Sequence, residues 1–354
     1  MKILIIGPSW VGDMIMSHSL YRTLKDQNTN TKIDVIAPDW CRSLLSRMPE
    51  VNKAIDIPLG HGTLALTKRY RLGKSLRDSG YDRAYILPHS FKSALVPFFA
   101  RIPFRAGWKG EMRYGLLTHV YNYPQEKALP LMVERYIALA YPQQHIKLAK
   151  TLSKPLLLPK IRLSEQEIEE TADIFNLKSN RSIIGLCPGA EFGLVKRWPH
   201  YHYASLSQKL IDQGYRIVLF GSAKDHPIGT EICNALTKNA REHCLNLVGQ
   251  TNLEQVVALI AACDAIVTND SGLMHVAAAV NKPLVALYGP TSPDFTPPLS
   301  PRAIVIRLIT VSYKICQKDI NQQYHHSLID IKPNTVLRAL QKLLTKDSQH
   351  SCTF

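Results

Sequence analysis

The alternation of short apolar runs with helix-like segments constrains the fold of this chain more than any other feature. In the first half, strand-like runs lie at residues 3–6, 33–37, 54–57 and 83–87. Helix-like segments lie between them, for example at residues 13–25 and 68–79. This order predicts a parallel sheet covered by helices, because each parallel connection needs a crossover. Residues 88–125, richer in aromatic, basic, proline and glycine residues, predict an elaborated loop region.

The second half repeats the alternation more regularly. Its strand-like runs lie at residues 182–187, 216–220, 244–247, 265–268, 283–288 and 303–307. Its helix-like segments lie at residues 201–213, 227–239, 253–263, 273–280 and 333–344. A connection over residues 151–182, with Pro155, Pro159 and an acidic surface helix, separates the halves, and we place the domain boundary around residues 160–182. We expect an α/β protein with two doubly wound, Rossmann-like domains, at residues 1–165 and 182–332. A helix and tail at residues 333–354 follow and could pack back on the first domain.

Composition narrows the classes of protein and partner. The chain has 354 residues, 45% of them hydrophobic, so it can bury a sizeable core and global disorder is excluded. Its net charge of +15 points to an anionic partner: a nucleic acid, a phosphorylated small molecule or an anionic membrane surface. The apolar runs are too short for a signal peptide or a membrane helix, which predicts a cytoplasmic protein. Seven scattered cysteines without a C-x-x-C pair predict neither disulfides nor a structural zinc site.

Four strands of the second half end in loops that carry small, turn-forming and charged residues. These loops read PGAEFGLVKRWP, GSAKDH, NDSGLMH and GPTSPDF. Ligands of open parallel sheets bind beyond the carboxyl ends of the strands, so the four loops predict a site at one edge. In NDSGLMH, Gly272 allows close approach to a helix start whose free N–H groups can hold a diphosphate. The alternative is an ordinary capped helix, with His275 as a satisfied neighbour.

Basic and acidic residues of the other loops fit the same site. Lys196 and Arg197 could neutralise phosphates, although solvated surface charge is the more common fate of such residues. Asp225 follows the second strand of this half and could accept a ribose hydroxyl, or it could simply cap a helix.

The first strand leads into the loop GPSWVGD. Gly7 and Gly12 have the spacing of a phosphate-binding loop, but Asp13 stands where such a loop has lysine. A carboxylate there predicts a general base that takes a proton from an acceptor hydroxyl. The alternative is a carboxylate that stabilises the helix start by about 0.3–1 kcal/mol. The segment from Phe91 to Tyr114 interleaves aromatic and basic residues and could meet a phosphorylated acceptor, or it could be a solvated basic face.

Two other function classes lack their motifs. A dehydrogenase predicts G-x-G-x-x-G after a strand, and neither half has one. A basic nucleic-acid-binding protein remains an alternative on charge, but no RNP motif or basic zipper helix occurs. The chain also lacks D-x-D, the paired carboxylates with which many sugar-nucleotide enzymes hold a metal. Basic side chains and a helix start are therefore expected to neutralise the leaving group, with no metal and no cofactor.

Taken together, these motifs resemble the bacterial ADP-heptose–lipopolysaccharide heptosyltransferases, and most closely the members that add the second heptose. The resemblance rests on GPSWVGD, CPGAEFGLVKRWP, FGSAKDH, TNDSGLMHVAAA and ALYGPTSPDFTPPLS, and it extends to LPHSFKSALVPFFARIPFRAGW and MVERYIALAY. It implies a GT-B architecture, with two Rossmann-like domains facing a cleft. It also implies inverting, metal-independent transfer from ADP-heptose to the first heptose of the inner core, on Kdo-lipid A. The alternatives are heptosyltransferase I and another GT-B enzyme with a different nucleotide sugar.

The resemblance also implies roles for individual residues. Asp13 matches the catalytic base. The donor and its diphosphate would be bound by Lys196, Asp270, Ser271, Gly272, Leu273, His275, Gly189 and Glu191. Adenosine would contact Ser222 and Asp225. The acceptor would contact Ser9, Trp10, Gly12, Lys92 and Arg113. The implied partners are ADP-heptose, a phosphorylated lipid acceptor and the anionic cytoplasmic face of the inner membrane.

Overall fold

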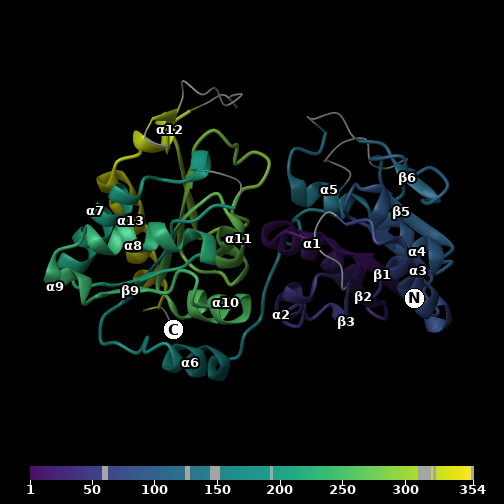
Figure 1. The fold of residues 1–354 in the computed structure, drawn as a ribbon, viewed down its shortest axis with the longest axis horizontal. Helices are drawn as coiled ribbons and strands as arrows, with labels where there is room; N and C mark the ends of the chain where they lie inside the picture. The colour runs from purple at the N-terminus through teal and green to yellow at the C-terminus, as the bar shows by residue number, and fades with distance from the viewer. Residues whose placement is uncertain are drawn as a thin grey trace. The chain divides into compact units, whose positions relative to one another are not determined.

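The computed structural model describes residues 1–57, 63–123, 128–143, 152–191, 194–309, 320–321 and 324–351. The chain divides into two compact units, Met1–Arg162 and Leu163–Phe354 (Figure 1). This division lies within the connection that the sequence indicates at residues 160–182.

The first unit is built on a six-stranded parallel sheet with the order β3-β2-β1-β4-β5-β6. Its strands are β1 Lys2–Ile6, β2 Lys32–Ala37, β3 Val51–Asp56, β4 Arg83–Ile86, β5 Phe104–Trp108 and β6 His119–Tyr121. Its helices are α1 Val11–Gln27, α2 Arg42–Leu45, α3 Leu66–Ser75, α4 Leu95–Phe99 and α5 Met132–Ala138. Short 3₁₀ turns are η1 Asp39–Cys41, η2 Arg77–Ser79 and η3 Phe91–Ala94. Helix α1 packs with α5, and α3 packs with α4.

Two strands of this sheet lie where the sequence predicts loops. Strands β5 and β6 extend the sheet beyond β4, within residues 88–125. Neither has an apolar run: β5 contains Arg105 and Gly107, and β6 has three residues. Gly107 lies so close to the neighbouring strand that a Cβ there would meet the carbonyl oxygen of Ile86 at 2.9 Å. This edge of the sheet therefore combines close backbone packing at Gly107 with buried aromatic rings, since Trp108 of β5 and Tyr121 of β6 are buried and lie edge-on at 5.8 Å.

The second unit has a sheet of the same design, six parallel strands in the order β12-β11-β10-β7-β8-β9. Its strands are β7 Ile183–Cys187, β8 Arg216–Leu219, β9 Cys244–Asn246, β10 Ala265–Asn269, β11 Leu284–Tyr288 and β12 Ala303–Arg307. Its longer helices are α6 Glu165–Ile174, α7 His200–Asp212, α8 His226–Asn234, α10 Leu253–Ala262, α11 Gly272–Ala279 and α13 Pro333–Ser351. Short elements are η6 Leu194–Lys196, η7 Ala223–Asp225, α9 Lys238–Arg241, β13 Ile320–Asn321, β14 Tyr324–His325 and α12 His326–Ile329. Residues 227–239, predicted as one helix, form α8 and α9, separated by a short turn.

The last helix belongs to the second unit. Helix α13 packs on α7 and on strands β10 to β12. Its residues Val336, Leu340 and Leu343 are buried in the same core as Trp198 and Tyr203. The apolar face of α13 is thus occupied by the second unit, whereas the sequence left open that this helix packs back on the first domain.

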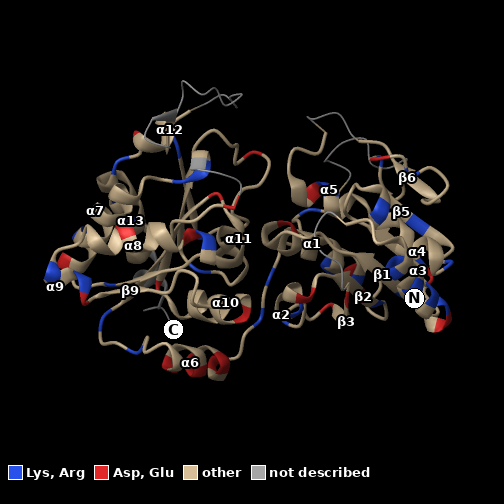
Figure 2. Ribbon diagram, viewed as in Figure 1, with Lys and Arg blue, Asp and Glu red and all other residues tan. Residues whose placement is uncertain are grey.

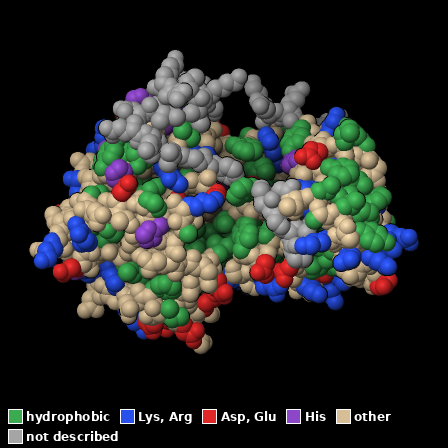
Figure 3. Space-filling view, in the orientation of Figure 1, with side chains coloured by type: hydrophobic (Ala, Val, Ile, Leu, Met, Phe, Trp, Pro, Cys, Tyr) green, Lys and Arg blue, Asp and Glu red, His purple; other side chains and the backbone are tan. Residues whose placement is uncertain are grey.

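Charge and apolar side chains are unevenly distributed. Acidic side chains gather on α6, whose sequence EQEIEETADI contains five acidic residues (Figure 2). Basic side chains gather around α3 in the first unit, next to a large hydrophobic area (Figures 2 and 3). Among the described helices, none is both long and apolar enough to cross a membrane.

Candidate active site

The loop after β1 places Asp13 in the first turn of α1. The backbone N–H of Gly7 donates to the carbonyl of Ile36 on the neighbouring strand at 2.8 Å. A Cβ on Gly7 would lie 2.9 Å from the Cε of Met14 and 3.3 Å from the carbonyl oxygen of Ile36, so little space remains at this turn. Asp13 itself is half-buried. The hydroxyl of Tyr136, on α5, donates to the Asp13 carboxylate at 3.2 Å.

Burial controls the protonation of this pair. Burial raises the pKa of Asp13, and the hydrogen bond from Tyr136 opposes that rise. Tyr136 is buried, and its burial together with the Asp13 charge raises the pKa of its hydroxyl well above the ordinary value. Tyr136 therefore stays a hydroxyl and a donor. A carboxylate with a raised pKa beyond the end of a parallel strand is a candidate general base. The sequence did not single out Tyr136, which lies in the segment MVERYIALAY.

The other acceptor candidates of the first unit differ in exposure. Ser9, in the loop before α1, and Gly12, in its first turn, are half-buried, and Trp10 at the N-cap of α1 is 37% exposed. Lys92 is half-buried in η3, which follows β4.

Arg113 is buried and bonded inside the first unit. Its guanidinium donates to the carbonyl of Pro88 at 2.8 Å and to the carbonyl of Trp108. It thus ties the loop after β4 to the end of β5. This contrasts with both sequence readings of Arg113, a contact to the acceptor and a solvated basic face, because its donors already meet two main-chain carbonyls.

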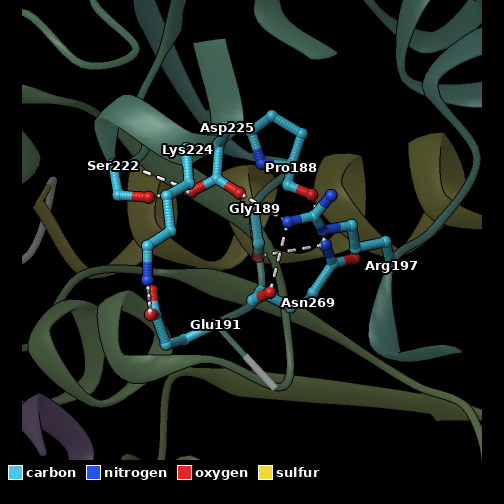
Figure 4. A network of polar contacts seen from close by, with 9 residues as sticks. Pro188, Gly189, Glu191, Arg197, Ser222, Lys224, Asp225 and Asn269 are labelled. Atoms are coloured by element: carbon cyan, nitrogen blue, oxygen red, sulfur yellow. Dashed lines mark hydrogen bonds and ion pairs between the residues drawn. The ribbon is translucent and has the colours of Figure 1, made fainter. Parts of the chain in front are cut away.

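In the second unit, Asn269 organises the loops at the carboxyl end of the sheet. Its side-chain NH₂ donates to the carbonyl of Pro188 at 2.8 Å (Figure 4). Its side-chain oxygen accepts from the backbone N–H of Trp198 and from the hydroxyl of Tyr203, each at 3.0 Å. A single buried amide at the end of β10 therefore fixes the loop after β7 and the start of α7.

The next residue along, Asp270, pairs with Lys196. The Nζ of Lys196 lies 2.9 Å from the Asp270 carboxylate, and the Asp270 side chain is only 8% exposed. His275 is buried on α11, and burial lowers its pKa to about 4; the Lys196 charge acts in the same direction and the Asp270 charge opposes it. The structure thus brings Lys196, at the end of η6, close to Asp270, which follows β10, and to His275 on α11.

The start of α11 leaves its first turn available to a ligand. Ser271 occupies the N-cap position, and within the part of the chain that the structure describes its side chain makes no capping hydrogen bond. Ser271, Gly272 and Leu273 are all half-buried. Uncapped N–H groups at a helix start attract anions, and the ammonium group of Lys196 is held beside Asp270 at the end of β10. Free N–H groups and a nearby ammonium group are the features that a diphosphate site requires.

A second ion pair holds the loop after β8. Arg197 donates to one oxygen of Asp225 at 2.9 Å, while the other oxygen accepts from the backbone N–H and the hydroxyl of Ser222 at 3.0 and 2.7 Å (Figure 4). A Cβ on Gly189 would lie 2.4 Å from the Asp225 carboxylate. Asp225 is thus buried and engaged on both oxygens. Of the two sequence readings, a ribose acceptor and a helix cap, the contacts with Ser222 match the cap, because the two residues form a capping box at the start of η7.

Glu191 lies at the exposed edge of this network. Its carboxylate accepts from the Nζ of Lys224 at 2.5 Å, and both side chains are largely exposed (Figure 4). Across the described ranges, no group of three or more His, Cys, Asp and Glu side chains is arranged to hold a metal ion. The five described cysteines are free; the other two, Cys316 and Cys352, lie outside the described residues.

Comparison with known proteins identifies the architecture and the family. The chain is 63% identical over 347 residues to lipopolysaccharide heptosyltransferase 2 of Escherichia coli K12. The aligned region covers 98% of this chain and 99% of that relative. The structure matches that of E. coli ADP-heptose lps heptosyltransferase II with a TM-score of 0.90 and 60% identity, over 98% of this chain and 100% of that one. It shares its fold with E. coli heptosyltransferase WaaC, solved with ADP-2-deoxy-2-fluoro heptose (TM-score 0.69, 20% identity, 97% and 99% coverage). These matches confirm the expected two-sheet GT-B architecture.

The family model described as glycosyltransferase family 9 (heptosyltransferase) matches residues 69–325. This range includes β4 to β6, the whole second sheet and every donor-site candidate named above. The chain therefore belongs to glycosyltransferase family 9, the heptosyltransferases.

Proposed function

We propose that this chain transfers heptose from ADP-heptose to the first heptose of the lipopolysaccharide inner core, with inversion and without a metal ion. Its full-length similarity to a heptosyltransferase numbered 2 supports this choice of acceptor. The 60% identical solved relative is described as an ADP-heptose lps heptosyltransferase II, which supports the choice of donor. The observation that carries the mechanism is the half-buried carboxylate of Asp13, held by Tyr136 and raised in pKa.

In this mechanism the acceptor hydroxyl attacks the anomeric carbon of the donor. A carbon–oxygen bond forms to the acceptor as the bond to the diphosphate oxygen breaks, and ADP leaves with the bonding electrons. Asp13 takes the proton of the hydroxyl. General base catalysis of this kind typically raises a rate by about 10²–10⁴-fold. Inversion in a single displacement needs no nucleophile from the protein.

The second unit supplies the groups that stabilise departing ADP. Lys196 would present an ammonium group beside the start of α11, whose first-turn N–H groups are free to bind an anion. Asp270 holds Lys196 in place before the donor binds. Charge stabilisation by these groups can replace the metal ion that paired carboxylates would otherwise bind.

A product assay with ADP-heptose and monoheptosylated Kdo-lipid A tests the proposal. Wild type should form the diheptosyl product equally well with and without EDTA. Asp13→Asn should bind the donor normally but lose turnover by about 10²-fold or more. Near-normal turnover of Asp13→Asn would remove the base assignment. Transfer to Kdo-lipid A without a first heptose would instead assign heptosyltransferase I activity.

A further inference from the structure

Helix α3 of the first unit is unusually basic. Its segment from Leu66 to Arg77, LTKRYRLGKSLR, contains five basic residues and no acidic one. Arg69 is buried and donates to the carbonyls of Leu64 and Thr63, so it serves the fold. Lys68, Arg71 and Lys74, by contrast, are exposed. These charges are consistent with an external anionic partner.

Apolar side chains are exposed among these charges. Leu66 and Tyr70 on α3 are 51% and 41% exposed, and Phe98 at the end of α4 is 39% exposed. Figure 3 shows this hydrophobic area on the first unit, with basic side chains along its border. Large apolar side chains exposed together in this way mark an interaction site more often than chance.

The two helices form one continuous surface. A Cβ on Gly73 would lie 2.5 Å from the Cβ of Phe99, so α3 and α4 are in close contact. The ring of Tyr70 lies edge-on to that of Phe99 at 5.3 Å, and Phe98 and Phe99 are 5.6 Å apart. The guanidinium of Arg105 lies 5.6 Å from the centre of the Phe98 ring, but it donates to the carbonyls of Leu116 and Ile102 and so, like Arg69, serves the fold. We call this the basic aromatic surface: Leu66, Tyr70, Arg71, Lys74 and Phe98.

The topology relates this surface to the candidate base. Strands β1 and β3 run in the same direction, so both end at the same edge of the sheet. Helix α3 begins on the chain after β3, with Leu66 as its first residue, and the Asp13 loop follows β1. Leu66 and Asp13 therefore both lie toward the carboxyl edge of the first sheet, whereas Lys74, near the end of α3, and Phe98, just before β5, lie toward its amino edge.

We propose that the basic aromatic surface docks the protein on an anionic lipid bilayer. Exposed basic residues are attracted to anionic lipid headgroups, while aromatic and aliphatic side chains enter the headgroup region. A second copy of this chain is a poor occupant, because the same positive charges would face one another. The proposal rests on the proposed function in one respect: a lipid-linked acceptor lies in such a bilayer.

Vesicle binding tests the charges directly. The double variant Arg71→Glu, Lys74→Glu should bind phosphatidylglycerol-containing phosphatidylcholine vesicles at least about tenfold more weakly than wild type. The matched control Lys238→Glu, Lys342→Glu reverses two exposed charges on the second unit and should bind as wild type. Equal losses of vesicle affinity in both variants would show that only net charge matters and would overturn the proposal.

A second pair of variants tests the apolar contribution. Leu66→Asn, Phe98→Asn should weaken vesicle binding several-fold at high salt, while Ile174→Asn, at a 69% exposed position on α6, should not. Thermal unfolding confirms that each variant is folded. The surface would be assigned to nucleic acid instead if the wild type bound a generic RNA more tightly than vesicles and the same variants lost that binding.

The outcome is separable from that of the proposed function. The surface variants should transfer heptose to a delipidated, water-soluble acceptor at the wild-type rate and lose activity only on acceptor embedded in vesicles. Asp13→Asn should bind vesicles as wild type but transfer to neither acceptor. Loss of transfer to the soluble acceptor in the surface variants would contradict a docking role.

Discussion

The hydroxyl of Tyr136 donates to the carboxylate of Asp13 at 3.2 Å, across 123 positions of sequence. The bond joins α5 to the first turn of α1, and the two helices pack against each other. Burial raises the pKa of Asp13 and this hydrogen bond lowers it, so Tyr136 adjusts how readily the carboxylate is ionised. On the proposed mechanism Tyr136 is a positioning residue, since it acts through Asp13 rather than on substrate.

Tyr136→Phe should therefore change the pH dependence of the reaction. Without the hydrogen bond, the pKa of Asp13 rises further and the acidic limb of the kcat profile moves to higher pH. The kcat at neutral pH should fall while the KM for donor stays unchanged. Tyr21→Phe, also buried in the first unit, is the control and should keep the wild-type profile. An unshifted profile in Tyr136→Phe would contradict the positioning role.

Asp13→Asn should be more stable than wild type at neutral pH. Because the pKa of Asp13 is raised above 3.8 in the folded protein, the folded chain binds more protons than the unfolded chain just above that pH. Wild-type stability therefore falls as pH rises through that window, and an uncharged Asn escapes this loss. Urea unfolding should give a higher free energy of unfolding for Asp13→Asn at pH 7. The difference in unfolding free energy should diminish as the pH falls toward the pKa that Asp13 has in the unfolded chain. A less stable variant at pH 7 would indicate that Asp13 serves the fold.

The sequence predicts the central strands of both sheets because buried parallel strands are continuous apolar runs. It does not predict β5 or β6 because neither is a continuous apolar run; their pairing combines close backbone approach at Gly107 with the contact of Trp108 and Tyr121, which the folded sheet brings together. The motifs locate Asp13, Lys196 and the start of α11 because each follows directly from a strand end. Tyr136 and the buried role of Arg113 were not predictable, because each depends on contacts between distant segments.

Lys196→Met should weaken ADP binding by about tenfold or more, since it removes the ammonium group beside the start of α11. It also leaves the buried Asp270 carboxylate without this partner, which should cost about 1–3 kcal/mol of stability. Isothermal titration with ADP and urea unfolding measure the two effects. Lys178→Met, which breaks the exposed pair with Asp173 on α6, is the matched control. An ADP affinity that is the same in both variants would contradict a role for Lys196 at the diphosphate.

Gly189→Ala should destabilise the second unit through Asp225. The added Cβ would lie 2.4 Å from the Asp225 carboxylate and displace it from Arg197 and Ser222, which should cost about 1–3 kcal/mol. The same substitution in an Asp225→Ala background should cost much less, because the three nearest atoms to the new Cβ all belong to that carboxylate. A double-mutant cycle by urea unfolding measures this difference. Additive costs would show that the two residues do not interact in this way.

His275 should make the protein sensitive to mild acid. Burial lowers the pKa of His275 to about 4 from 6.5, so the unfolded chain binds more protons than the folded chain between these values. The stability that depends on neutral His275 is therefore fully present above pH 6.5, and it is lost as the pH falls toward 4. His275→Gln should flatten the dependence of the unfolding free energy on pH in this range. The exposed His226→Gln is the control and should keep the wild-type slope. Because His275 lies near Asp270 and Lys196, bound ADP should shift the pH dependence of wild-type stability. An unchanged slope in His275→Gln would show that other groups cause the acid sensitivity.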